Sequence, residues 1–217
     1  MKNRKQKAIS CTAAVLCLAL FGACSGEGYK EKPLSENTLP LTASLSADES
    51  VRTGNAGKFS ENNLAFSTEF FRRAYTGGNT LVSPLSLCAA LAMAANGAKG
   101  ETRFEMERVL GMRGEALNAD LSVYLQEVAK SGALSIADSL WIRDSATEQI
   151  KTGFLQKNRD YYDAEIYAAP FDQTTVSDIN TWTANATRGM IKELIREIPP
   201  DSVTYLINAL YFSGEWQ

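Results

Sequence analysis

Histidine is absent from all 217 residues of the sequence. Histidine is the side chain that most often acts as a general base, and it is the commonest ligand of protein-bound metals. A Ser-His-Asp hydrolase and a histidine-ligated metal enzyme are therefore excluded for this chain. No other residue pattern points to a metal or a cofactor, and we predict neither.

The sequence has no cluster of positive charge beyond the first seven residues. Lysine and arginine number 22 against 25 aspartates and glutamates, which gives a net charge of −3. No basic stripe appears that could follow a phosphate backbone, so we predict no nucleic-acid partner. With 45% hydrophobic and 22% charged residues, the composition is typical of a globular domain.

The longest apolar run is too short to cross a membrane as a helix. It covers Ala8–Ala23 and follows a basic segment that contains Lys2, Arg4, Lys5 and Lys7. A spanning helix needs about 20 apolar residues, whereas a basic head, a short apolar core and small residues at the end are typical of a secretory signal. We predict a signal peptide over residues 1–23.

The end of this signal, LFGAC, resembles the signal of bacterial lipoproteins. In those proteins small residues precede a cysteine that is acylated and becomes the new N-terminus. Gly22 and Ala23 fit the pattern, whereas Phe21 stands where a smaller aliphatic residue is usual. The resemblance implies lipid attachment at Cys24 and a lipid-anchored protein of the bacterial cell envelope, at the outer membrane or cell surface. Ordinary cleavage near Ala23, with Cys24 left as a free thiol, is the alternative.

Cysteine is also scarce. Of the four cysteines, Cys11 and Cys17 lie in the predicted signal and Cys24 is the lipid candidate. Cys88 lies in an apolar segment, where a small buried side chain is the simplest interpretation. We therefore predict no disulfide.

Residues 24–58 contain few large apolar side chains. They are rich in Ser, Thr, Gly, Asn, Glu and Lys. This composition predicts a flexible tether between the membrane and the folded domain.

Hydrophobic spacing predicts an α+β domain over residues 59–217. Apolar residues recur at helical intervals in some segments and alternate, or run continuously, in others. The predicted helices cover residues 61–76, 85–95, 100–110, 116–130, 147–162 and 174–188. The predicted strands cover residues 80–82, 134–143, 164–171 and 202–212.

Two of these segments carry strong signals. Ser83 followed by Pro84 is a typical helix start, and the helix over Leu85–Ala95 is apolar on nearly every side, as expected of a fully buried helix. Ser202–Phe212 is almost continuously apolar and predicts a central strand covered on both faces. Such a strand left at a sheet edge would favour aggregation.

An enzyme is the weakest functional interpretation. Asp138, Asp144, Glu165 and Asp172 could be paired in principle, but we interpret them as solvated residues of loops and strand ends. The glycines punctuate helices and do not form a phosphate-binding loop. The glycosylation-like sequence at Asn185 is interpreted as chance.

Several segments, in order, resemble the serpins, the serine protease inhibitor superfamily. SPLSLCAALAMAANGAKGETRFEM, from Ser83 to Met106, resembles the family's signature segment. Later segments of the same family are resembled by four further stretches of this sequence: ADSLWI, YYDAEIYAAPF, INTWTANATRGMIKELI and NALYFSGEW. The resemblance covers Phe59–Gln217 and implies a serpin-like α+β fold, with N-terminal helices packed on part of a large, mostly antiparallel sheet.

The resemblance also implies a function. Serpins trap serine or cysteine proteases by inserting a cleaved loop as an extra strand. The motif match implies that Ser83, Ser86, Asn208 and Trp216 belong to the region where the sheet opens.

The family's reactive loop, second sheet and hinge histidine correspond to sequence beyond Gln217, so no reactive-loop residue is assigned. We expect this polypeptide alone not to inhibit, and to need a C-terminal half. The alternative is a non-inhibitory, surface-anchored structural or binding module.

Overall fold

The computed structural model describes residues 14–22 and 29–214. The predicted lipid site Cys24 and the predicted hinge residue Trp216 lie outside the described residues. The helices are α1 Ala56–Ala74, α2 Pro84–Ala95, α3 Gly100–Leu110, α4 Gly114–Ala129, α5 Thr152–Tyr162 and α6 Gln173–Ala186, with short 3-10 helices at Leu41–Ser44, Glu49–Val51 and Asp144–Gln149. The strands are β1 Ala14–Gly22, β2 Leu39–Pro40, β3 Leu134–Arg143, β4 Glu165–Ala169 and β5 Thr204–Gly214.

The strands form one sheet in the order β1-β5-β3-β4-β2. β3 pairs with β5 antiparallel and with β4 parallel, β1 pairs with β5 parallel, and β2 pairs with β4 antiparallel. The α+β class is confirmed, and the described part of the sheet is mixed rather than mostly antiparallel. The β3–β4 pair is parallel because α5 lies between the two strands in the chain, so both run in the same direction.

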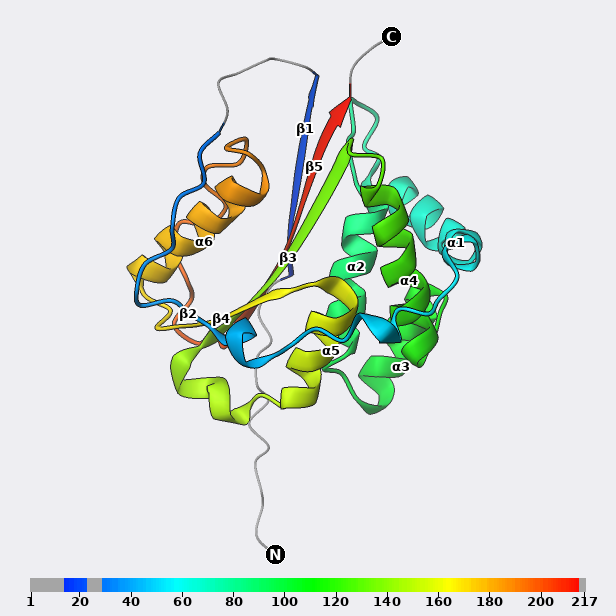
Figure 1. The fold of residues 1–217 in the computed structure, drawn as a ribbon. Coiled ribbons are helices and arrows are strands. Elements are labelled where there is room, and N and C mark those ends of the chain that lie inside the picture. Colours follow the sequence, from blue (N-terminus) through cyan, green and yellow to red (C-terminus); the bar gives the residue numbers. More distant parts are fainter. Residues whose placement is uncertain (1–13, 23–28, 215–217) are drawn as a thin grey trace, which may run out of the picture.

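Helices cover both faces of the sheet (Figure 1). α6 lies on one face, and its Ile179 and Trp182 join a core with Trp141, Ile207 and other sheet residues. On the other face α2 packs against β5 and is surrounded by α1, α3, α4 and α5, which build the larger core. Among the described helices, none has the length and apolar composition needed to cross a membrane.

The two strongest predicted elements are confirmed. α2 begins directly after Ser83, with Pro84 at its first position, and its small side chains Cys88, Ala89, Ala90 and Ala92 are fully or almost fully buried. Small side chains let the helix approach the sheet closely. The predicted strand over 202–212 is β5, and a run of its residues from Tyr205 to Leu210 is buried. The predicted strand over 80–82 is wrong, because those residues form no strand.

The prediction of a flexible tether over residues 24–58 is wrong for the part that the structure describes. Residues 29–55 follow the surface of the domain, and α1 already begins at Ala56, not after Ser60. Leu45 is buried in the larger core, and Arg52 forms an ion pair with Asp163 at 2.7 Å. The polar side chains that suggested a tether make specific hydrogen bonds to the domain instead, so composition alone was misleading.

A second attachment of this segment is the buried carboxylate of Asp178 in α6. It accepts hydrogen bonds from the Ser35 backbone N–H at 2.9 Å, from Ser35 Oγ at 2.5 Å and from Thr38 Oγ1 at 2.6 Å. Hydrogen bonds to a charged acceptor are stronger than neutral ones. Asp178 therefore holds the chain immediately before β2.

We expect Asp178→Asn to release this segment locally. The amide nitrogen cannot accept the two hydroxyl hydrogen bonds, and a loss of about 2 kcal/mol corresponds to roughly 30-fold faster cleavage of the opened segment. Limited proteolysis with mapping of cuts in residues 33–44 measures the effect. Asp201→Asn, at an exposed position, is the matched control and should cleave like the unaltered chain. Equal rates for the two variants would contradict the role given to Asp178.

Candidate functional site

The first part of the candidate site is the start of α2. Ser83 has an extended backbone conformation, and its Oγ accepts a hydrogen bond from the Ser86 backbone N–H at 3.1 Å. The same hydroxyl lies 3.1 Å from Ser86 Oγ. Ser86 is fully buried. The structure therefore brings the two predicted serines together, and the N-cap role of Ser83 follows from this geometry.

The second part is a polar pair across the centre of the sheet. Asn208 of β5 and Asp138 of β3 are register partners, and Asn208 Nδ2 donates to Asp138 Oδ1 at 2.8 Å. Leu206 and Leu140, each two residues away, belong to the core on the α2 side of the sheet. Because side chains alternate along a strand, Asp138 and Asn208 face the same side. Both are buried.

The interpretation of Asp138 as a solvated residue is wrong. Its side chain is buried within the sheet, whereas Asp144, Glu165 and Asp172 are exposed as predicted. The signal was present in the sequence, because Asp138 occupies the same alternate positions as the inward-facing Leu140. The alternation should have outweighed the general preference of carboxylates for the surface.

Burial shifts the ionisation of this pair. Loss of hydration raises the pKa of Asp138 from its ordinary 3.8 to about 7, against the lowering effect of the hydrogen bond from Asn208, and the negative charge of Asp163 raises it slightly further. Burial is also the main reason why the pKa of Tyr162 is raised, and nearby Cys88 and Asp138 contribute. These groups therefore share one poorly hydrated region.

The side-chain oxygen of Asn208 is a further feature of this region. Asn208 Oδ1 is buried and receives no hydrogen bond from the described residues. The hydrogen bonds found at Ser83 and Ser86 connect the two serines to each other, and the partner found for Asn208 is Asp138. A proton on Asp138 would supply a donor for this acceptor.

The third part of the site is a network of amide side chains at the C-terminal end of α2. This network was not predicted from the sequence. Tyr162 donates from its hydroxyl to Asn118 Oδ1 at 2.6 Å, Asn118 Nδ2 donates to Asn96 Oδ1 at 2.8 Å, and Asn96 Nδ2 donates to Asn158 Oδ1 at 3.0 Å. Asn96 is the residue that ends α2. The network links the C-terminal end of α2 to α4 and α5, so both ends of the buried helix are held by polar side chains.

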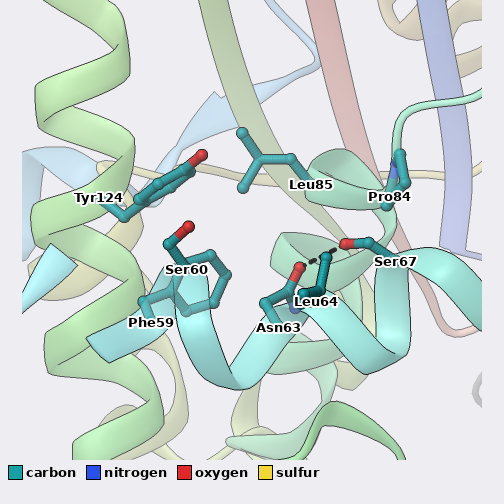
Figure 2. A pocket seen from close by; sticks show the side chains of 8 residues that line it. All are labelled: Phe59, Ser60, Asn63, Leu64, Ser67, Pro84, Leu85 and Tyr124. Carbon is teal, nitrogen blue, oxygen red and sulfur yellow. Dashed lines mark hydrogen bonds between the residues drawn. The ribbon is translucent and has the colours of Figure 1, made fainter. Parts of the chain in front are cut away.

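A pocket opens beside the start of α2. It has a volume of about 240 Å³ and lies between α1, Pro84 and Leu85 of α2, and Tyr124 of α4, as Figure 2 shows. The ring of Phe59 contacts that of Tyr124 with centroids 4.9 Å apart. The Asn63 side chain accepts from Ser67 and donates to Cys88 Sγ at 3.2 Å. No unpartnered buried polar atom faces this pocket among the described residues, and we assign it no ligand.

The chemistry of the site is structural. Burial raises the pKa of the Cys88 thiol to about 12, which keeps it protonated and unreactive. The part of the chain that the structure describes holds no group of three or more possible metal ligands. The described site consists of two buried polar pairs, Ser83–Ser86 at the start of α2 and Asp138–Asn208 on the paired strands β3 and β5, in an apolar interface where α2 packs against β5.

Comparison with known proteins identifies the class. The family model of the serpins, described as serine protease inhibitors, matches residues 61–217. The chain belongs to the serpin family. It is 32% identical over 148 residues to leukocyte elastase inhibitor of Bos taurus, a match that covers 64% of this chain. It is 30% identical over 159 residues to alpha-2-antiplasmin of Mus musculus, a match that covers 71% of this chain.

A solved structure gives the same result for the fold. The crystal structure of the thermophilic serpin tengpin in the native state matches with a TM-score of 0.73 at 39% identity and covers 83% of this chain. The chain spans about half the length of that structure, 48%. It spans 39% of the leukocyte elastase inhibitor and 32% of alpha-2-antiplasmin. The serpin-like fold predicted from the sequence motifs is confirmed.

Proposed function

We propose that this chain supplies the sheet-hinge part of a serpin that inhibits serine or cysteine proteases. The family match over residues 61–217 carries the proposal. Two structural features support it: the buried start of α2, and the Asp138–Asn208 pair in the sheet below it. A sheet that opens must part at a defined place in its interface with the helix layer. Serpin inhibition proceeds by insertion of the cleaved reactive loop into a sheet.

We further propose that the protein is exported and anchored in the bacterial cell envelope. Signal removal before Cys24 and acylation of its thiol would attach it to a membrane, since each buried CH₂ of a lipid chain contributes about 0.8 kcal/mol. The basic head, the apolar run and LFGAC support this proposal. The segment 29–55 would then lie on the folded domain, close to the anchor.

The anchor is tested by the intact mass of protein extracted from bacterial membranes. We expect a mass lower than that of the 217-residue chain by residues 1–23 and higher by the acyl groups on Cys24. Cys24→Ser is the control and should yield unprocessed, unacylated protein. An unacylated mass for the unaltered protein, or no difference from the variant, would contradict the lipid anchor.

The inhibitory role is tested separately with two polypeptides. The 217-residue chain alone should form no denaturant-resistant complex with serine proteases, because the reactive loop of the family corresponds to sequence beyond Gln217. The product of the reading frame extended past Gln217 should form one. If the extended product forms none while folding cooperatively, the second candidate, a non-inhibitory surface-anchored binding module, replaces the first.

A further inference from the structure

The polar segment before β2 begins against the C-terminal end of α6. Asn185, in the last turn of α6, accepts hydrogen bonds from the Tyr29 hydroxyl at 3.0 Å and from the Lys32 backbone N–H at 3.1 Å, and its Nδ2 donates to the Lys32 carbonyl oxygen at 2.8 Å. The Tyr29 ring lies so close to Gly189 that a Cβ added there would be 2.6 Å from it. In Figure 1 the blue start of this segment lies beside the orange loop that follows α6. Tyr29 and Lys32 are therefore fixed on the domain.

The chain reverses direction directly after α6 and turns two side chains outward. Arg188 and Gly189 have positive φ angles of 51° and 81°, and the Gly189 N–H donates to the Ala184 carbonyl oxygen at 2.6 Å. Arg188 and Met190 are exposed. The Arg188 guanidinium lies over the ring of Tyr211, 4.9 Å from its centroid, which holds the charge at this surface. The loop therefore presents a cation and an apolar side chain beside the start of the segment.

These two parts of the chain, far apart in the sequence, together form a basic patch. Its exposed basic residues are Lys30, Lys32, Arg188 and Lys192. None of the four forms an ion pair with a carboxylate of the described residues. Glu193, next to Lys192, pairs with Arg196 instead. Four basic residues and one acidic residue, Glu31, occupy positions 29–32 and 188–192, which gives this surface a net charge of +3 in a chain whose net charge is −3.

The place of the basic patch in the chain points to its partner. Cys24 precedes Tyr29 by five residues, and five residues span at most about 18 Å when fully extended. Acyl chains on Cys24 would therefore keep Lys30 and Lys32 close to the membrane surface. Anionic lipid headgroups attract basic residues near them, and an exposed apolar side chain such as Met190 is suited to the same interface.

We propose that the basic patch is the face with which the folded domain lies on its own membrane, in contact with anionic lipid headgroups. The proposal rests on the proposed lipid anchor at Cys24, which supplies proximity, whereas the basic patch supplies orientation. A lipid tether alone leaves a domain free to rotate, and charge complementarity over one face removes that freedom. α3, which lies on the other side of the sheet from α6, then faces away from the membrane (Figure 1).

Orientation on the membrane tests the proposal in the acylated protein. A fluorescent label is attached through Met190→Cys, beside the basic patch, or through Glu105→Cys, at an exposed position of α3. Cys88 is buried and stays unlabelled. In vesicles made of equal parts of phosphatidylcholine and phosphatidylglycerol, quenchers carried on lipid headgroups should quench the label at position 190 at least about threefold more than the label at position 105. Equal quenching at the two positions would overturn the proposal.

Vesicle binding without acylation separates the basic patch from the anchor. Two triple variants are made in the full chain with Cys24→Ser. One carries Lys30→Gln, Lys32→Gln and Lys192→Gln. The control changes the net charge equally at exposed cations of α1, α3 and the end of α4, by Lys58→Gln, Arg108→Gln and Lys130→Gln.

The variant of the basic patch should bind phosphatidylglycerol vesicles about a hundredfold more weakly than the control, because each basic residue at an anionic surface strengthens binding about fivefold. The two variants should bind phosphatidylcholine vesicles alike. Residues 1–23 are common to both, so their contribution cancels in the comparison. Equal binding to phosphatidylglycerol vesicles, or the same difference on phosphatidylcholine, would overturn the proposal. A failed lipid anchor is seen in the intact mass instead, so the two proposals fail in distinguishable ways.

Discussion

Asp138→Asn is expected to stabilise the chain by about 4 kcal/mol at pH 8 and to have little effect at pH 4. The folded pKa of Asp138 is about 7, against an ordinary value of 3.8, and each pKa unit corresponds to about 1.4 kcal/mol. Because the folded state binds this proton more tightly than the unfolded state, the stability that the group contributes is present below pH 4 and is lost as the pH rises to about 7.

The amide adds a second benefit. Asn208 Nδ2 can still donate to the oxygen at position 138, and the new amide group can donate to Asn208 Oδ1, which has no partner among the described residues. A reciprocal amide pair across β3 and β5 carries no charge that must be buried. The substitution therefore removes the pH-dependent cost and fills an unsatisfied acceptor.

Urea unfolding of both proteins from pH 4 to pH 8 measures the effect. Other carboxylates, such as Glu107 and Glu115, have pKa values lowered by hydrogen bonds from Arg103 and Lys157, and their opposite pH dependence is common to both proteins. The difference between the two stability curves therefore isolates position 138. Asp144→Asn, at an exposed position, is the control. Parallel curves for Asp138→Asn and the unaltered chain would show that the carboxylate is not buried as described.

Trp141→Ala is expected to cost about 3–5 kcal/mol of unfolding free energy. Trp141 is fully buried in the middle of the sheet, its ring lies against that of Tyr167 with centroids 4.6 Å apart, and its Nε1 donates to Ser139 Oγ at 3.0 Å. Alanine would leave a large cavity between the sheet and α6 and leave the hydroxyl of Ser139 without this donor. Since domains are stable by about 5–15 kcal/mol, much of the margin would be lost.

Denaturant unfolding followed by far-ultraviolet circular dichroism measures this loss. Trp141→Phe keeps an aromatic ring against Tyr167 and should cost about half as much or less. The comparison separates the volume of the side chain from its hydrogen bond. A loss below about 1 kcal/mol for the alanine variant would mean that the core between α6 and the sheet can collapse around the cavity.

Local signals account for what could be predicted from the sequence. The start of α2 was predictable because Ser83 and Pro84 act on the backbone next to them, and β5 because its apolar run is continuous. The family could be recognised because its motifs are contiguous. The tether prediction was wrong because it was based on composition alone. Residues 29–55 are polar, but Asp178 and other acceptors hold them against the domain.

By itself, the sequence determined most of the helices, the strands β3, β4 and β5, the family, and the burial of α2, since these follow from propensity, caps and apolar spacing in neighbouring residues. Only the tertiary structure decided that Asp138 meets Asn208, that β1 lies on β5, and that Asn96, Asn118 and Asn158 join in one network. These contacts join residues far apart in the chain. Their partners depend on strand register and helix packing, which no local pattern specifies.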